Sequence, residues 1–424
     1  MRRNIFISFI LIAALLLGGC SFGGDLSAML TPPAMSVGQE ALTGAIRAAI
    51  GESYELVYPQ AGPYRTGIIS VDLTGDERNE AVCFYRALSK GAKLRFLVME
   101  NQGESWSVLA RGESEASSVG RVAFGDIDGR GAAELIVGWQ YLTEADGSFD
   151  IYTLEDGSAV SCHTGLYSRF VVLEGNPGAL VVISRNAESR AVTASLIGKQ
   201  QGGIGVVNTV AMNDRAVDYL AVEAGRIKGD LPAVFVDEQL EGGQSATEVL
   251  VINEQGRLAN ELINQVNMST LRYTAVTCRD VNHDERAEVP TEVMLPSYMR
   301  NGVSENQYLI QWNSYDGQQL EPVSQAFINV TENFSLSFTK EWEGKITIER
   351  PADRDRAYQF KSLKGELLFT VQVYGLAEYS EELGRQGWRK LYTDSDRVYT
   401  VYCEEENSFG ITYTQIYGLF DAIS

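Results

Sequence analysis

FGDIDGRGAAELIVGW, at residues 124–139, joins an acidic turn directly to an apolar run that is typical of a β-strand. The same order of acidic and polar residues recurs in DLTGDERNE from Asp72 and in DVNHDERAE from Asp280. Each copy has an acid at its first and ninth positions. Asp126 follows Asp72 by 54 residues and precedes Asp280 by 154, which is three periods of about 51. The sequence therefore predicts a repeated structural unit of about 50 residues.

Degenerate copies of the unit are expected in the long interval. Two turn-rich segments there run into Val-rich strands, VLEGNPGALVVIS from Val172 and GRIKGDLPAVFV from Gly225. A hairpin turn with glycine repeats in phase, because Gly103 and Gly157 each lie 31 residues after the first Asp of their unit. One further period reaches Phe334, where FSLSF, KITIE, YQFKS and LLFTVQV are interpreted as the four strands of a sixth unit.

The units are predicted to be sheets rather than helix pairs, since alternating Val, Tyr, Phe and Thr dominate their runs. A unit of four short strands cannot bury both of its faces alone, so neighbouring units must stack. We therefore predict an all-β fold, a β-propeller of six or seven four-stranded blades over residues 52–374. A short helix is predicted over residues 36–51, with Leu42 and Ile46 on its apolar face and Gly51 at its end.

The last segment, residues 375–424, has two interpretations. In the first, the strand-like runs at residues 54–71 pair with those at residues 388–403 in a seventh sheet, which ties the two ends together and leaves no exposed edge. In the second, six blades are followed by a small α+β cap, because helix-like pieces occur near residues 376–386 and at the end of the chain.

The amino terminus has the order of a secretory signal peptide: two arginines, an apolar run over residues 5–17, and two glycines before Cys20. The stretch LLLGGC resembles the lipobox of bacterial lipoproteins. That resemblance implies removal of residues 1–19 and a lipid on the sulfur of Cys20, with acyl chains such as palmitate in the membrane. Residues 20–35, which contain a Pro pair, are then a tether. The expected location is the outer, extracellular side of the cell membrane.

Charge excludes some classes of partner. The chain of 424 residues has 35 Lys and Arg against 56 Asp and Glu, for a net charge of −21. Phosphates would be repelled, so nucleic-acid binding is not expected. Neither a GxGxxG nor a GxxxxGK[ST] motif is present, and nucleotide binding is therefore not predicted.

At its acidic repeats the chain resembles the FG-GAP, or VCBS-type, propeller repeats of integrin alpha chains and of many bacterial surface proteins. FGDIDGRGAAELIVGW is the best match. The lipobox, the Pro-containing tether and the opening YP…DLTGDERNEAVCFY also look like a group of lipoproteins from Gram-positive anaerobes. The resemblance covers about residues 25–350 and implies a fold and a location, but no established activity.

In the FG-GAP family the acidic loop can bind Ca²⁺, because oxygens at positions one, three, five and nine converge on a cation that prefers six to eight oxygen ligands. The matching residues of the first and third loops are Asp72, Thr74, Asp76, Glu80, Asp280, Asn282, Asp284 and Glu288. Both loops depart from the family pattern, because Glu77 and Glu285 occupy the position of a glycine.

The middle loop, with Asp126, Asp128 and Glu134, keeps the glycine as Gly131 but has Arg130 at the fifth position. A guanidinium there competes with a metal and can pair with either aspartate. Calcium is thus expected in the first and third loops before the second. The alternative is that all three loops are turns whose side-chain oxygens accept backbone N–H groups.

Cysteine and histidine offer little chemistry. Four cysteines follow the lipobox, each in a strand-like run: Cys83, Cys162, Cys278 and Cys403. Two disulfides and four separate thiols both remain open, while their spacing does not predict zinc. His163 and His283 are interpreted as structural, and no catalytic constellation is visible.

Aromatic residues are the remaining candidates for binding. The five tryptophans recur at about the spacing of the blades: Trp106, Trp139, Trp312, Trp342 and Trp388. They could stack on sugars at a propeller face, but filling the space between blades is the favoured interpretation.

The sequence as a whole predicts a non-catalytic binding or scaffold module at the cell envelope, with an envelope protein or polysaccharide as its partner. A glycan-acting hydrolase or lyase is the alternative, and it would need two carboxylates about 5 to 10 Å apart in a pocket at the propeller axis. A solute-capture lipoprotein is a third possibility, disfavoured because alternating strands and helices are absent from the pattern.

Overall fold

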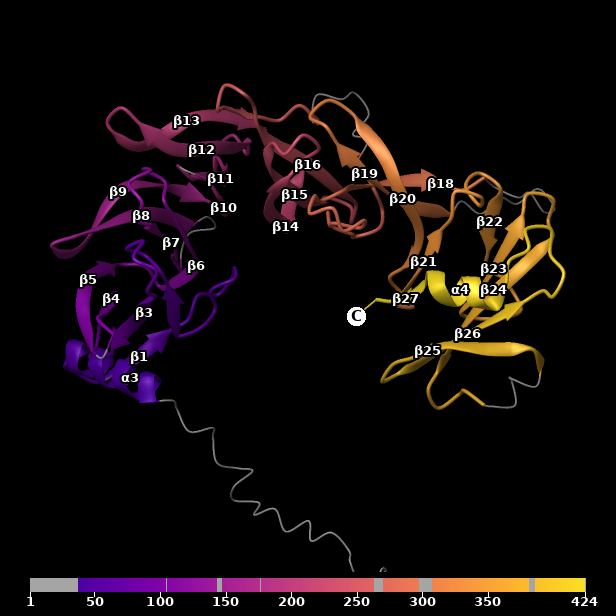
Figure 1. Cartoon of the computed structure of the whole chain (residues 1–424), viewed down its shortest axis with the longest axis horizontal. Helices are drawn as coiled ribbons and strands as arrows, with labels where there is room; N and C mark the ends of the chain where they lie inside the picture. The colour runs from indigo at the N-terminus through magenta and orange to yellow at the C-terminus, as the bar shows by residue number, and fades with distance from the viewer. Residues whose placement is uncertain are drawn as a thin grey trace, which may run out of the picture.

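The computed structural model describes residues 37–103, 105–142, 147–175, 177–262, 270–296, 307–380 and 386–423. The predicted signal peptide, Cys20 and the tether lie outside these ranges. Within them, no helix is both long and apolar enough to cross a bilayer. The described strands form six antiparallel blades that follow one another along an arc (Figure 1). The all-β propeller fold predicted from the repeats is confirmed.

The first two blades are joined. The first contains β1 (Tyr54–Val57), β2 (Ile68–Val71), β3 (Glu80–Ala87), β4 (Leu94–Asn101) and β5 (Trp106–Ser114). The second contains β6 (Ser118–Gly125), β7 (Glu134–Gln140), β8 (Gly147–Glu155) and β9 (Gly157–Tyr167). A short parallel pairing of β5 with β9 makes them one nine-stranded sheet.

The third and fourth blades have four strands each. The third contains β10 (Arg169–Leu173), β11 (Ala179–Arg185), β12 (Val192–Gln200) and β13 (Gly203–Ala211). The fourth contains β14 (Ala216–Arg226), β15 (Pro232–Leu240), β16 (Ser245–Ile252) and β17 (Leu258–Ala259). In the second to fourth blades the first strand lies on the concave side of the arc (Figure 1).

The fifth and sixth blades include the end of the chain. The fifth contains β18 (Val289–Met294), β19 (Tyr308–Tyr315), β20 (Leu320–Asn329), β21 (Phe334–Phe338) and β27 (Phe420–Ala422). The sixth contains β22 (Ile346–Glu349), β23 (Ala357–Ser362), β24 (Leu367–Gly375), β25 (Trp388–Thr393) and β26 (Arg397–Cys403). The described helices are α3 (Val37–Ile50) and α4 (Tyr413–Leu419).

The hydrophobic cores lie between consecutive blades. Phe84 and Phe96 of the first blade pack with Trp139 of the second, and Val181 of the third packs with Val234 of the fourth. The middle strands are therefore apolar on both faces, as in EAVCFYRA of β3, whereas outer strands such as β9 are mostly exposed. Burial between neighbours is the physical reason that the units must stack.

The free face of the first blade is covered by α3. Ile46 is 1% exposed and packs on Cys83, Tyr85 and Leu97, strand residues that have no blade on that side. Gly51 ends the helix with a left-handed φ of 72°, and its N–H donates to the carbonyl of Arg47. The predicted amino-terminal helix is confirmed.

The predicted seventh sheet is wrong. β1 and β2 both pair with β3, end to end along the same edge, while β25 and β26 extend the sixth blade beyond β24. The first and sixth blades lie at opposite ends of the arc (Figure 1). The cap interpretation is also incomplete, because the last segment supplies strands to two blades in addition to α4.

The predicted start of the sixth unit needs a second correction. FSLSF, at residues 334–338, is β21, and it pairs with β20 of the fifth blade rather than with the strands that follow it. A tight turn after Asn329 folds β21 back on β20, so the hairpin overrides the repeat period. The first strand of the sixth blade is β22.

Candidate functional site

The three acidic loops occupy equivalent places. Two of them join consecutive strands of a blade, β2 to β3 and β6 to β7, and the third leads into β18. The glutamate at the ninth position is buried in each, with exposures of 1%, 4% and 1% for Glu80, Glu134 and Glu288. Its Oε2 accepts a backbone N–H at the second position of its own loop, at 2.9, 2.7 and 2.9 Å. Each buried glutamate therefore holds the backbone of its own loop in place.

The aspartate at the first position organises the tip of each loop. Asp72, Asp126 and Asp280 accept the N–H of the sixth residue at 2.9, 3.0 and 2.9 Å. That residue has a left-handed φ in all three loops, 66° at Glu77, 93° at Gly131 and 66° at Glu285. The family pattern predicts glycine at this position, and the left-handed φ is a conformation that glycine adopts at low cost. The interpretation as hydrogen-bonded turns therefore describes the backbone of all three loops.

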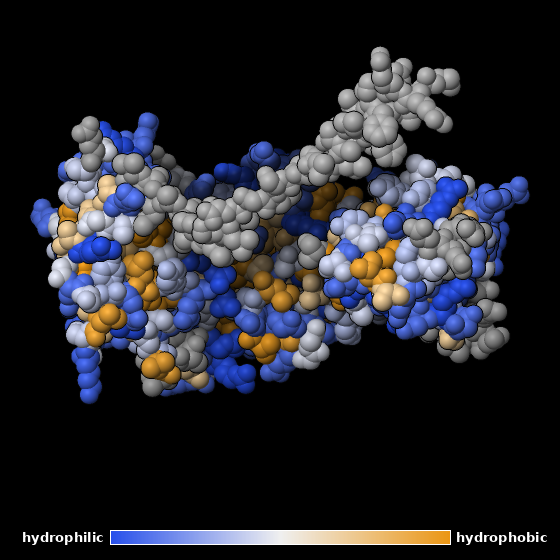
Figure 2. Space-filling model, turned by 90° about the horizontal axis from the view of Figure 1, so that it is seen from below, coloured by the Kyte–Doolittle hydropathy of each residue, from blue (hydrophilic) through white to orange (hydrophobic). Residues whose placement is uncertain are grey.

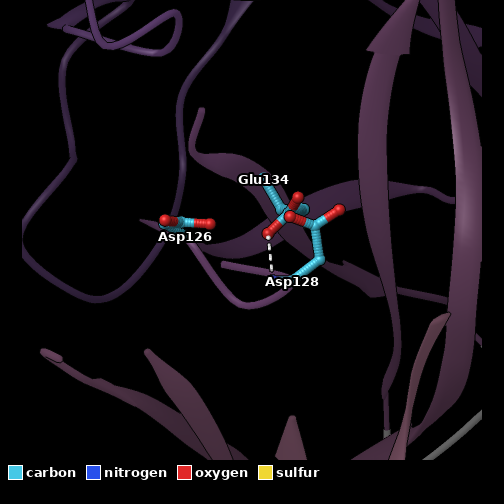
Figure 3. Close-up of side chains that lie close together, drawn as sticks. All are labelled: Asp126, Asp128 and Glu134. Carbon is cyan, nitrogen blue, oxygen red and sulfur yellow. Dashed lines mark hydrogen bonds between the residues drawn. The ribbon is translucent and has the colours of Figure 1, made fainter. Parts of the chain in front are cut away.

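Only the middle loop, among the described residues, brings three acidic side chains within metal-binding reach. One oxygen each of Asp126, Asp128 and Glu134 lie within 4.8 Å of one another (Figure 3). Asp128 and Glu134 are buried and Asp126 is half-buried. The sequence ranked this loop last for calcium, whereas the structure gives it the carboxylate geometry that best suits a hard cation.

Arg130 competes for this cluster, as its position in the sequence suggested. Its Nε lies 3.1 Å from Oδ2 of Asp128, and the arginine side chain is 71% exposed. The backbone N–H of Arg130 also donates to Asp126 and to Asp128, both at 2.9 Å. Because a carboxylate oxygen has two lone pairs, these bonds leave acceptor capacity on the aspartates. A cation at this place would require the exposed guanidinium to move into solvent.

The electrostatics of the second and third loops are alike. Burial raises the pKa of Glu134, and the nearby charges of Asp128 and Asp126 raise it further. Burial and the charges of Asp284 and Asp280 likewise raise the pKa of Glu288. A bound cation would relieve this repulsion by favouring the ionised carboxylates.

The third loop differs from the middle one in having an amide donor among its candidate ligands, whereas the first loop shares the backbone contacts of the middle one. The amide nitrogen of Asn282 donates to Asp284 at 3.3 Å and to Glu288 at 3.2 Å, so a donor occupies the place that a cation would need. The backbone N–H of Thr74 donates to Glu80 at 3.2 Å, and that of Arg78 donates to Asp76 at 2.9 Å. Within the described part of the chain, neither loop forms a convergent group of three acids.

A second concave site lies where the second, third and fourth blades meet, and we call it the arginine pocket. It has a volume of about 210 Å³ and lies at the ends of β7, β9 and β11 and the starts of β8, β10 and β14. Its polar lining is Gln140, Tyr167, Ser168, Arg169, Arg185, Asp218 and Tyr219. The lining contains two guanidiniums and one carboxylate, so it lacks the carboxylate pair expected of a glycosidase.

Most of the tryptophans are buried, as expected if they fill the space between blades. Trp139, Trp312 and Trp342 are 1%, 2% and 1% exposed, and Trp388 is 9% exposed. Trp139, Trp312 and Trp342 are therefore too deeply buried to stack on sugars. Figure 2 shows that apolar residues on the visible side occur in small separate groups between hydrophilic ones.

All four described cysteines are free thiols. Cys83 lies in the first blade, Cys162 in the second and Cys403 in the sixth, and Cys278 precedes β18. The two-disulfide interpretation is therefore wrong, because blade stacking separates the four strand-like runs. His163 is half-buried beside Phe149, with ring centroids 5.9 Å apart, and His283 is exposed at the tip of the third loop.

Sequence reasoning missed the arginine pocket. Its residues come from four separate segments, and no motif connects Arg169 with Arg185 or Asp218. The one available signal was glycine in strand-like runs, at Gly138 and Gly147. Glycine within a strand often indicates close approach of another group, here the ring of Tyr167.

No protein-family model matches the chain, and no curated protein matches it. Among solved structures it is similar to Saccharomyces cerevisiae Sqt1, at 11% identity over 81% of this chain and 86% of that chain, with a TM-score of 0.34. It is also similar to rhamnogalacturonan lyase YesW, at 11% identity over 74% and 76%, with a TM-score of 0.31. A third is the β-propeller domain of the Trilobed protease from Pyrococcus furiosus, at 12% identity over 75% and 93%, with a TM-score of 0.30.

Proposed function

We propose that the protein is a lipid-anchored β-propeller on the outer side of the cell membrane, where it binds an envelope protein or polysaccharide without transforming it. The observation that carries the location is the amino-terminal order of arginines, apolar run and LLLGGC at residues 15–20. Two acyl chains on Cys20 would suffice for stable anchoring without a transmembrane helix.

The architecture supports a binding role. Blades that bury their middle strands between one another leave their connecting loops free on the two rims of the arc. The arginine pocket and the acidic loops both lie at strand ends, where loops and neighbouring blades meet. Such a rigid framework with polar recesses suits recognition of a partner.

We also propose that the middle acidic loop binds Ca²⁺ through Asp126, Asp128 and Glu134, in keeping with the FG-GAP resemblance. The supporting observation is the convergence of the three carboxylates within 4.8 Å. The cation would hold the loop that links β6 to β7. This loop also contacts the first blade, because the N–H of Ala133 donates to the carbonyl of Leu73 at 2.9 Å.

The glycan-acting alternative has one observation in its favour. Asp128 and Glu134 line a recess of about 260 Å³, and the pKa of Glu134 is raised by burial. However, Glu134 is 4% exposed and its Oε2 accepts two backbone N–H groups. A general acid must reach the scissile oxygen, so this glutamate is better suited to holding the loop. The solute-capture alternative lacks the two α/β lobes in the described chain.

The anchor is tested with the full chain expressed in a bacterium that processes lipoproteins. We expect wild-type protein in the membrane fraction and Cys20→Ala in the soluble fraction. Cys162→Ala is the matched control, because this exposed thiol lies on β9 and its loss leaves the predicted anchor intact. Retention of Cys20→Ala in the membrane fraction, or release of the control, would contradict the proposal.

A further inference from the structure

Arg169 and Arg185 line the arginine pocket, and a third arginine outside the lining, Arg121, interacts electrostatically with Arg169 although the chain is strongly acidic. Arg121 is half-buried, and among the described residues it has neither an ion pair nor a hydrogen bond from its guanidinium. Its contact is with the ring of Phe170, whose centroid lies 6.0 Å from the guanidinium carbon. Burial lowers the pKa of Arg121, and the charge of Arg169 lowers it further. The two cations therefore repel each other, and the charge of Glu223 offsets only part of this effect on Arg121.

Arg169 is oriented toward the pocket by its neighbours. Its guanidinium lies 5.5 Å from the ring centroid of Tyr219, and it donates to the backbone carbonyl of Ser168 at 2.8 Å. Its carboxylate partner is Asp218, at 2.8 Å, whose side chain is 69% exposed. An exposed carboxylate is held weakly by such a pair, because water competes for both charges. Asp218 is thus a partner that a ligand oxyanion can replace.

Tyr167 supplies a neutral donor in a slot built from glycines. A Cβ on Gly120, Gly138 or Gly147 would overlap the ring or hydroxyl of Tyr167. Burial raises the pKa of Tyr167 to about 12, so its hydroxyl keeps its proton at neutral pH. Glycine at these three positions leaves room for the ring of Tyr167, which lines the pocket together with Arg169.

We propose that the arginine pocket binds one oxyanion, a carboxylate or phosphate group, carried on a ligand about the size of a monosaccharide. Arg169 would form the direct contact, Arg121 would supply the second positive charge, and the hydroxyl of Tyr167 would donate a hydrogen bond. Asp218 would rotate into solvent when the ligand enters. This inference rests on the proposal that the protein is a binding module, and it names the chemistry that the module recognises.

The pocket suits an oxyanion better than a neutral sugar. A planar guanidinium matches carboxylate and phosphate oxygens, and charge-assisted hydrogen bonds are the strong ones. An anion would also relieve the repulsion between Arg121 and Arg169, which gives it differential affinity over an uncharged analogue.

The test is calorimetric titration of the full chain in detergent with sodium glucuronate and, separately, with inorganic phosphate. Glucose is the neutral control. We expect saturable binding of at least one anion and none of glucose; the preferred anion identifies the source of the oxyanion. Binding should weaken about tenfold or more in Arg169→Gln and in Arg121→Gln.

Two further variants keep the result interpretable. Arg95→Gln is the matched control. The side chains of Arg95 and Arg169 are both 38% exposed, and each forms an ion pair, that of Arg95 with Glu52 at 3.0 Å. Arg95 lies outside the pocket lining. It should bind like the wild type. Asp218→Asn removes the competing carboxylate from an exposed position and should strengthen binding a few-fold, even if an arginine variant fails to fold.

Absence of binding of either anion to both wild type and Asp218→Asn would overturn the inference. Equal weakening by Arg95→Gln and Arg169→Gln would also overturn it. Neither result would affect membrane fractionation of Cys20→Ala, so failure of the pocket and failure of the proposed anchor are distinguishable.

Discussion

Backbone conformation at single residues shows where the repeats have diverged. Glu77 and Glu285 adopt a left-handed φ of 66°, and Gly131 holds the equivalent position at 93°. A residue with a Cβ pays about 1 to 2 kcal/mol in this region. The loops keep the shape nonetheless, because Asp72 and Asp280 accept the N–H of the strained residue.

Glu77→Gly is therefore expected to stabilise the protein by about 0.5 to 1 kcal/mol, since relief of the left-handed strain exceeds the added entropy of the unfolded chain. The measurement is the urea midpoint of unfolding. Gly131→Ala is the matched control at the same loop position. No atom lies within 4 Å of its added Cβ, so only conformational strain should lower the midpoint. A lower midpoint for Glu77→Gly would show that its side chain has an unrecognised role.

At the scale of elements, the fourth blade contains a buried pair of acids. Glu238 of β15 and Glu248 of β16 are 0% and 4% exposed and lie near each other on one face of the sheet. Asn213, which follows β13 of the third blade, donates its side-chain amide to Glu238 at 2.8 Å and its N–H to Glu248 at 3.1 Å. The pair thus helps to join two blades.

This pair makes stability depend on pH. Burial and the charge of Glu248 raise the pKa of Glu238 from its ordinary value of 4.5 to about 9. Between these values the folded state binds a proton that the unfolded state has lost, so stability falls as pH rises through this window. Glu238→Gln should make stability less dependent on pH. It should also raise the melting temperature at pH 8, by about 2 to 4 °C for each kcal/mol of stability gained.

The matched control for Glu238→Gln is Glu241→Gln, because Glu241 is 69% exposed and its ion pair with Arg190 is long, at 3.8 Å. Melting temperatures are measured from pH 5 to pH 9. If the slope of melting temperature against pH is unchanged in Glu238→Gln, another group is responsible for the pH dependence.

At the scale of the whole molecule, each blade depends on its neighbours. The hydrophobic cores lie between blades, and the first two acidic loops touch across the first such junction, where a Cβ on Gly75 would overlap the carbonyl of Gly131. A ligand that fixes one loop therefore acts on two blades. Its effect should appear in global unfolding, since the blades stabilise one another through these junctions.

Calcium is expected to raise the melting temperature relative to chelator. A ligand at a hundred times its dissociation constant adds about 2.7 kcal/mol to the stability. The rise should increase in Arg130→Gln, which removes the competing guanidinium, and disappear in Asp128→Asn. Mg²⁺ is the control, because it demands stricter octahedral geometry. Equal shifts in wild type and Asp128→Asn would place any calcium outside the middle loop.

Much of the blade organisation could be predicted from the sequence. The acidic turn before an apolar run recurs at a fixed period, and both features are local, so they identify the units and most of their strands. The repeat period alone places β21 in the sixth blade, whereas a hairpin after Asn329 pairs it with β20 of the fifth, because strand pairing depends on contacts that the period does not encode. The pairing of the strands at the two ends of the chain likewise depends on contacts that the sequence pattern does not encode.

The sequence by itself determined that the fold is an all-β array of stacked blades, because alternation and periodicity require shared burial between units. It also determined which loops carry acids. Only the tertiary structure decided that Asp126, Asp128 and Glu134 converge, and that Arg169 and Tyr167 line one pocket. These groups come together because of the directions of their side chains and the packing between blades. Neither the directions nor the packing can be read from residue spacing along one segment of the chain.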